Sequence, residues 1–142
     1  MTFVATARPG DPELDERIAA HRRQRPAAWR TVDAGPDLAA AVVSAHPDAV
    51  LLLDSLTLWV AAVLEAGERP SESWARAASA LGVRGAPAIV VSDEVGQGVV
   101  PATVAGRRFR DELGRLNQLV ARDAATVTVV VAGIPVAVKA VT

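Results

Sequence analysis

Ala49-Val50-Leu51-Leu52-Leu53 (residues 49–53) is the stretch that decides the fold, because it is short, apolar and continuous. Runs of the same kind occupy residues 87–91 and 127–131, and residues 2–6 form a fourth candidate. Continuous rather than alternating apolar runs are typical of strands in a parallel sheet that is covered on both faces. We therefore expect these four runs to form a parallel sheet, with residues 136–139 as a candidate fifth strand at its edge.

Helical segments are predicted between these strands. Asp11 and Pro12 offer an N-cap and a first-turn proline, and Gly67 offers a C-terminal stop. The alternation of strands and helices indicates an α/β fold with a doubly wound sheet. No connection is long or biased enough to be a linker, so residues 1–142 are expected to form one domain. The predicted helices cover residues 12–23, 37–45, 56–66 and 107–123, and the predicted loops cover residues 65–73 and 82–87.

The composition excludes several classes of function. The 142 residues carry 15 basic and 16 acidic side chains, so no overall field favours nucleic acid or an anionic membrane. The absence of cysteine excludes disulfides and thiolate catalysis, and two histidines cannot build a histidine-rich metal centre. No apolar run reaches the ~20 residues of a membrane span, and the first residues do not form a signal peptide. A cytoplasmic protein is therefore expected.

A histidine followed by a cluster of arginines forms the first candidate site. His21 lies in the last turn of the first predicted helix, and Arg22, Arg23 and Arg25 follow within four residues. Guanidinium groups hold phosphate oxygens by charge-assisted bonds, and an imidazole beside them could attack phosphorus to form a covalent phosphoramidate. The alternative is a basic last helical turn that complements the helix dipole. The residues alone leave both interpretations open.

Polar residues that directly follow strands form two further candidates. Asp54 closes the run at 49–53, at the edge of an α/β sheet where ligands bind. Such a carboxylate commonly holds Mg²⁺ on nucleotide phosphates, although Asp54 could equally cap the next helix. After the run at 87–91, Gly96 and Gly98 would allow a close backbone approach to a ligand, but a plain loop explains this pattern as well.

Together these segments resemble one family, the bifunctional adenosylcobinamide kinase/adenosylcobinamide-phosphate guanylyltransferases of cobalamin biosynthesis. Five blocks occur in the family's order and spacing, and the resemblance extends from about residue 3 to residue 139. The blocks are RIAAHRRQRPAAWRT (17–31), LLLDSLTLWV (51–60), VVSDEVGQGVVP (90–101), RRFRDELGRLNQLVA (107–121) and VAGIPVAVK (131–139).

The resemblance implies an activity and a set of site residues. The family phosphorylates adenosylcobinamide with a nucleoside triphosphate, GTP or ATP, and then transfers GMP from GTP to adenosylcobinamide phosphate through a guanylylated histidine. His21 occupies the position of that histidine, and Asp54 would hold Mg²⁺. The implied assembly is a homo-oligomer, a trimer in the family. The implied nucleotide contacts are Ala5, Thr6, Ala7, Arg22, Arg23, Gln24, Arg25, Asp33 and Asp54.

The chain departs from the family pattern in one important respect. The family has a three-layer, mostly parallel sheet of the P-loop nucleoside triphosphate hydrolase type, which opens with a strand and a G-G-x-R-S-G-K-S loop. That motif is absent from these residues, so the fold is expected to lack its first βα unit and the chain to have lost the kinase step. Asp93 also stands where many relatives carry Asn. The alternative is a degenerate paralogue that binds a nucleotide or a partner without turnover.

Overall fold

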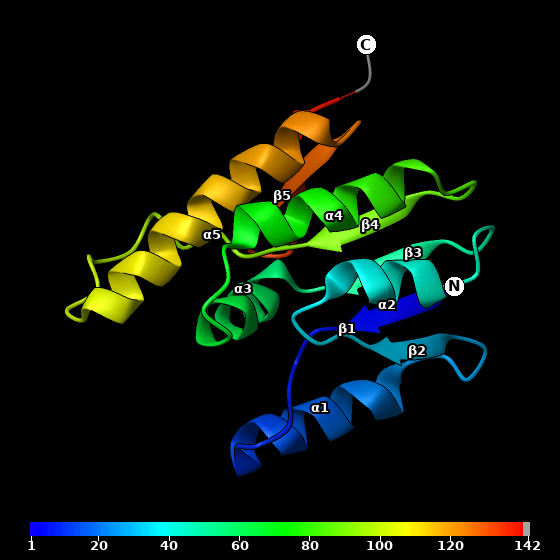
Figure 1. Cartoon of the computed structure of the whole chain (residues 1–142), viewed down its shortest axis with the longest axis horizontal. Coiled ribbons are helices and arrows are strands. Elements are labelled where there is room, and N and C mark those ends of the chain that lie inside the picture. The colour runs from blue at the N-terminus through cyan, green and yellow to red at the C-terminus, as the bar shows by residue number, and fades with distance from the viewer. Residues whose placement is uncertain (141–142) are drawn as a thin grey trace.

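A four-stranded parallel sheet forms the centre of the molecule. The computed structural model describes residues 1–140, and its parallel strands lie in the order β2-β1-β3-β4 (Figure 1). The strands are β1 (Thr2–Ala5), β2 (Arg30–Asp33), β3 (Leu51–Asp54) and β4 (Ala88–Val91).

The register of these strands aligns their carboxyl ends. Ala5 is paired with Asp33 on one side and with Asp54 on the other, and Asp54 is paired in turn with Val91. Residues that are far apart in the chain therefore end in one row. In open α/β sheets this edge is where ligands bind.

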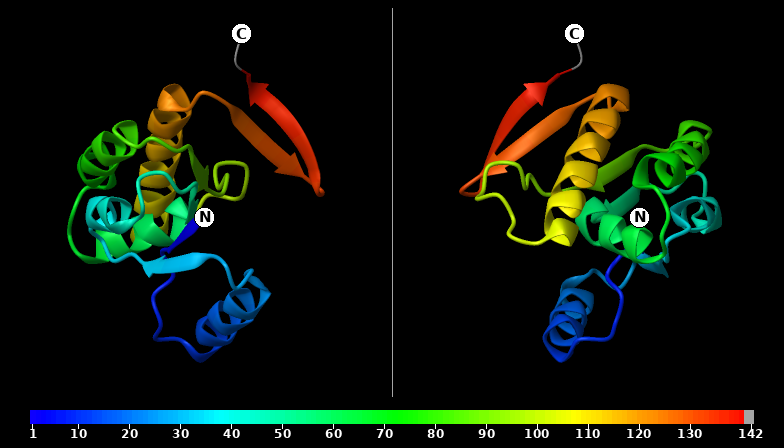
Figure 2. Two further views of the ribbon diagram at one scale, coloured as in Figure 1. Left: turned by 90° about the vertical axis from the view of Figure 1, so that its right-hand side faces the viewer. Right: turned by 60° about the vertical axis from the view of Figure 1, so that its left-hand side comes forward.

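Five helices flank the sheet: α1 (Pro12–Gln24), α2 (Leu38–Ser44), α3 (Leu56–Glu65), α4 (Pro70–Gly82) and α5 (Val104–Asp123). Helices α2 to α5 share one apolar core with the sheet, in which Val4, Leu53 and Trp59 are fully buried. α1 lies apart on the other face, and none of its residues is buried (Figure 2). The expected α/β architecture, with helices on both faces of a mostly parallel sheet, is confirmed.

Local sequence explains where three of these helices begin. Asp11, Asp37 and Thr103 precede α1, α2 and α5, and each side chain accepts a hydrogen bond from a backbone N–H of the first turn. Each bond satisfies a donor that the helix itself leaves without a partner. α5 begins at Val104, about one turn earlier than expected, because Thr103 is the cap.

Two expected strands do not belong to the parallel sheet. β5 (Val127–Val131) and β6 (Ile134–Lys139) pair with each other as an antiparallel hairpin. Only Ala132 and Gly133 separate them, and both have positive φ angles, 50° and 79°. A parallel connection needs a crossover of a dozen or more residues, whereas a two-residue turn with positive φ joins antiparallel strands. The expectation of a parallel strand at 127–131 and a further one at its edge was therefore wrong.

Two elements lacked a recognised signal in the sequence. β2 is a polar edge strand, in which only Val32 is apolar, so it forms no apolar run. α4 begins at Pro70, inside the segment expected to be a loop at 65–73. A proline is well tolerated in the first turn of a helix, and the following Trp74 and Ala77 face the core. Pro70 therefore marks a helix start.

Candidate functional site

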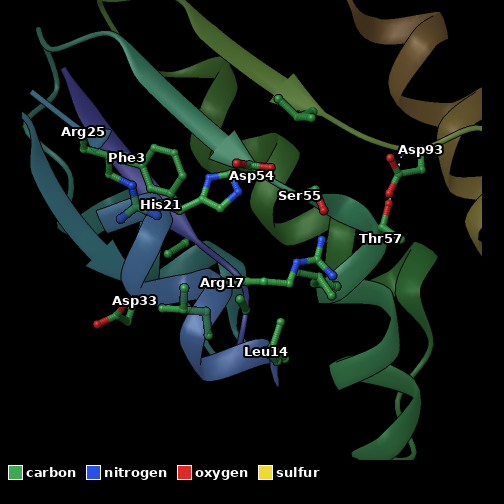
Figure 3. Close-up of a pocket in the computed structure, with 15 residues that line it drawn as sticks. Phe3, Leu14, Arg17, His21, Arg25, Asp33, Asp54, Ser55, Thr57 and Asp93 are labelled. Atoms are coloured by element: carbon green, nitrogen blue, oxygen red, sulfur yellow. Dashed lines mark hydrogen bonds between the residues drawn. The ribbon is translucent and has the colours of Figure 1, made fainter. Parts of the chain in front are cut away.

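A pocket of about 260 Å³ lies between α1 and the carboxyl end of the sheet (Figure 3). α1 forms one wall, the ends of β1 and β3 form the opposite wall, and the start of α3 forms a third side. None of the residues of α1 is buried, because this helix stands away from the core and leaves the pocket open between itself and the sheet. The lining residues are Phe3, Ala5, Ala7, Leu14, Arg17, Ile18, His21, Arg25, Asp33, Asp54, Ser55, Thr57, Leu58, Val91 and Asp93.

His21 lies on the face of α1 that is turned to the pocket. Leu14, Ile18 and His21 recur at spacings of four and three residues, which places them on one side of a helix. The His21 side chain is exposed, and Figure 3 shows its imidazole ring directed toward Asp54 at the end of β3. The structure thus brings the candidate nucleophile and the candidate metal ligand to one pocket. The imidazole is accessible rather than buried in apolar packing.

Arg25 is held next to His21 by the sheet. Its guanidinium carbon lies 3.5 Å from the centroid of the Phe3 ring, and its Nη1 donates a hydrogen bond of 3.3 Å to Thr31 Oγ1. A guanidinium over an aromatic face is attracted by the ring quadrupole. Partial burial lowers the pKa of Arg25, and the neighbouring charge of Arg22 lowers it further. An arginine remains charged despite such a shift, so Arg25 keeps a fixed cation at the pocket.

Arg22 faces a second, shallower hollow at the edge of the sheet. Its Nη2 donates to both carboxylate oxygens of Asp33, at 3.0 and 3.2 Å. Both side chains are at least half exposed, so the pair contributes little to stability. The hollow adjoins the pocket and shares Arg25 and Asp33 with it, and Trp29 forms part of its wall. A ligand in the pocket could therefore extend toward β2.

Thr6 lies beneath the pocket instead of lining it. Its hydroxyl donates to the Ser55 carbonyl oxygen and accepts from the Ser55 N–H, both at 2.8 Å. Thr6 is 1% exposed, so these two bonds join the ends of β1 and β3 inside the protein. They fix the backbone next to Asp54.

The loop after β4 is anchored beside the same pocket. The Asp93 N–H donates to Thr57 Oγ1 at 3.1 Å, and Asn117 Nδ2 donates to the Asp93 carbonyl oxygen at 3.0 Å. The Ser92 hydroxyl donates to Asn117 Oδ1 at 2.6 Å. These bonds join the loop to α3 and α5. Asp93 and Asp54 therefore line one pocket.

The donor set fits a magnesium ion that arrives with a nucleotide. Among residues 1–140, no three histidine or acidic side chains are grouped closely enough to form a metal site by themselves. Mg²⁺ is usually held by one or two carboxylates together with substrate phosphates and water. Asp54, with Asp93 in the same pocket, offers that kind of partial site.

The expected nucleotide contacts divide into three groups. Ala5, Ala7, His21, Arg25, Asp33 and Asp54 line the pocket, and Arg22 lines the adjoining hollow. Thr6 lies below the pocket, whereas Arg23 and Gln24 line neither space. Sequence reasoning missed Phe3, Leu14 and Arg17. Leu14 and Arg17 could have been found by counting back seven and four residues from His21 along the helix.

Comparison with known proteins identifies the family. Residues 1–138 match the family described as cobinamide kinase / cobinamide phosphate guanyltransferase. The bifunctional adenosylcobalamin biosynthesis protein CobP of Pseudomonas aeruginosa is 41% identical over 142 residues, covering 98% of this chain and 82% of the relative. The CobU proteins of Salmonella typhimurium and Escherichia coli are 35% and 33% identical over 155 residues, covering 98% of this chain and 86% of each relative.

The structure has the α/β architecture expected for such a protein, with its pocket at the carboxyl end of the sheet. Among residues 1–140, no helix combines the length and the apolar character that a membrane crossing requires. The sequence match extends over nearly the whole chain, and the identity to three named relatives exceeds 30%. This chain belongs to the cobinamide kinase / cobinamide phosphate guanyltransferase family.

Proposed function

We propose that this chain acts in cobalamin biosynthesis by transferring GMP from GTP to adenosylcobinamide phosphate, with His21 as the covalent carrier. One observation carries the proposal: His21 is accessible in the pocket that Asp54 and Arg25 also line. The relatives are bifunctional adenosylcobalamin biosynthesis proteins, and the family description names a guanyltransferase. An imidazole, a cation and a carboxylate in one pocket suit nucleotidyl transfer.

The proposed transfer has two steps. In the first, a ring nitrogen of neutral His21 attacks the α-phosphorus of GTP. An N–P bond forms, the bond to the bridging oxygen breaks, and pyrophosphate leaves with that electron pair while the second ring nitrogen keeps its proton. In the second, a phosphate oxygen of adenosylcobinamide phosphate attacks the same phosphorus, the N–P bond breaks, and His21 regains its lone pair. The product is adenosylcobinamide-GDP.

Arg25 has a defined part in both steps. It is held beside His21 by Phe3 and Thr31, so it can stabilise the charge that develops on the transferred phosphoryl group without moving. A donor that is already in place is worth about 2.7–4 kcal/mol in a transition state. A bound Mg²⁺ would neutralise phosphate charge, and Asp54 would hold it.

We propose that this chain does not catalyse the kinase step. Phosphoryl transfer depends on positioning and on charge stabilisation, and the 142 residues contain no glycine-rich G-K-S loop to supply them. The guanylyl transfer uses His21 and its arginines, which are present. We propose a cytoplasmic homo-oligomer as the working form.

Labelling with [α-³²P]GTP tests the proposal. We expect the wild-type chain to become labelled, the label to be released by acid as a phosphoramidate would be, and His21→Ala to take none. His46→Ala is the matched control, because it removes the other histidine, which lies on the connection before β3 and outside the pocket.

Absence of label from the wild-type chain at any GTP concentration would contradict the transferase proposal. Equilibrium binding of GTP without label would then favour the alternative, a nucleotide-binding protein without turnover. Labelling that persists in His21→Ala would assign the carrier to another residue.

A further inference from the structure

We propose that Arg17 is a phosphate-binding residue of the transfer reaction, on the opposite side of His21 from Arg25. This inference rests on the proposed function and adds Arg17 to the nucleotide contacts that the resemblance implies, which do not include it. Arg17 lines the pocket, four residues before His21 on α1. Figure 3 shows its side chain directed across the pocket toward the start of α3, where Ser55 and Thr57 lie.

The helix places three functional groups in a row. Arg17, His21 and Arg25 are separated by four residues each, so they follow one another along one side of α1 and its end. Successive members are about 6 Å apart along the axis, because each residue advances the helix by about 1.5 Å. All three line the pocket. The nucleophile is therefore flanked by a cation on both sides.

The two arginines differ in what already holds them. Arg25 is stacked on Phe3 and bonded to Thr31. Within the part of the chain that the structure describes, the guanidinium of Arg17 takes part in no hydrogen bond or ion pair, and Arg17 is exposed to solvent. A structural role would show an internal partner. A cation that points into a pocket without one is available to an anionic ligand.

Charge in the pocket explains why a second cation is needed. Asp54 would be neutralised by the Mg²⁺ that it holds, but Asp93 lines the same space and would repel the phosphates of a nucleotide. Of the two arginines that line the pocket beside His21, Arg25 lies on the β1–β2 side, whereas Arg17 reaches the α3 side. The first turn of α3 has no side-chain cap, so its backbone N–H groups add to the attraction for an anion.

Arg17 is therefore assigned to the phosphate that is not transferred. In the first step this is the pyrophosphate that leaves, and in the second it is the phosphate of the acceptor. Both present the same chemistry, a phosphate oxygen with a negative charge close to His21. The two half-reactions distinguish them, because each can be measured alone.

The test compares Arg17→Ala, Arg17→Lys and Arg115→Ala. Arg115 is an exposed residue of α5 that pairs with Glu112 at 3.0 Å, so its removal changes the net charge equally at a distance from the pocket. The first measurement is the single-turnover rate of labelling by [α-³²P]GTP at saturation. The second is the transfer of label from isolated guanylylated protein to adenosylcobinamide phosphate. Thermal unfolding of each variant checks that its fold is retained.

We expect Arg17→Ala to slow at least one half-reaction by about 10²- to 10³-fold, as the loss of one transition-state donor does elsewhere. Arg17→Lys should recover part of that loss, and Arg115→Ala should stay within about twofold of wild type. A loss in labelling assigns Arg17 to pyrophosphate, and a loss confined to transfer assigns it to the acceptor phosphate. Rates within twofold of wild type in both steps would overturn the proposal.

A binding measurement separates this inference from the proposed function. If the wild-type chain takes no label, the transferase proposal fails, but titration with inorganic pyrophosphate still tests Arg17. We then expect Arg17→Ala to weaken pyrophosphate binding about tenfold relative to Arg115→Ala, a difference of about 1.4 kcal/mol. Equal affinities in the two variants would show that Arg17 is only a solvated surface cation.

Discussion

Replacement of Thr6 by valine tests whether the pocket depends on a buried polar link. Valine has nearly the shape of threonine but no hydroxyl, so the change removes both hydrogen bonds to Ser55 and little volume. The Ser55 N–H would then lack a partner in a part of the protein where Ser55 itself is 8% exposed. The Ser55 carbonyl oxygen would keep the hydrogen bond of 3.2 Å that it accepts from the Trp59 N–H. Thr6→Ser is the matched control, because it keeps the hydroxyl and loses only a methyl group.

The size of the effect follows mainly from the Ser55 N–H, which would lose its hydrogen-bond partner. A buried donor or acceptor without a partner costs about 1–3 kcal/mol. With one such group, and a second hydrogen bond lost at a carbonyl that keeps Trp59 as a partner, we expect Thr6→Val to lower the free energy of unfolding by about 2 kcal/mol. Thr6→Ser loses one buried methyl, which corresponds to about 1 kcal/mol.

Urea denaturation at equilibrium, followed by tryptophan fluorescence, measures both variants. Trp59 and Trp74 lie in the core and should report global unfolding. We expect the midpoint to fall more in Thr6→Val than in Thr6→Ser, with the slope m unchanged. A Thr6→Val protein as stable as Thr6→Ser would refute the reasoning. It would show that water or local relaxation fully replaces the two hydrogen bonds to Ser55.

Two further substitutions test other features of the structure. Arg84 donates hydrogen bonds to four carbonyl oxygens at the end of α2 and in the segment that follows it. In urea titrations, Arg84→Ala should therefore lower the free energy of unfolding by about 2–4 kcal/mol. The control Arg76→Ala removes an exposed arginine of α4 and should change the free energy of unfolding by less than about 0.5 kcal/mol. Phe3→Leu removes the aromatic ring under the guanidinium of Arg25, and a contact of this kind is worth about 0.5–2 kcal/mol. Labelling of the protein by [α-³²P]GTP should therefore slow by about 2- to 30-fold. An unchanged rate would show that Thr31 alone positions Arg25.

Local patterns in the sequence were sufficient for much of the fold. Asp11 and Pro12 predicted the start of α1, and the apolar runs at 49–53 and 87–91 predicted β3 and β4. These signals succeed because caps and buried strands depend on residues that are close in the chain. The order of the five motif blocks was also sufficient to indicate the family, which the match over residues 1–138 confirms.

The predictions that were wrong or missing concern strands whose pairing depends on distant residues. The valine run at 127–131 has the composition of a buried parallel strand, yet it pairs with 134–139 across a two-residue turn. β2 carries almost no apolar signal, and it forms a strand because β1 offers it an edge to pair with. Strand pairing of this kind is decided by the sheet as a whole, not by the strand's own residues.

The sequence by itself determined the chemistry that this chain can offer: an imidazole, several guanidinium groups and carboxylates placed after strands. Only the tertiary structure decided which of these share a pocket, because parallel register aligns Ala5, Asp33 and Asp54 across intervals of more than twenty residues. Thr6 shows the same division. Its hydroxyl is visible in the sequence as a candidate ligand contact, but the fold directs it to Ser55, 49 residues away, and leaves the pocket to Arg17 and His21.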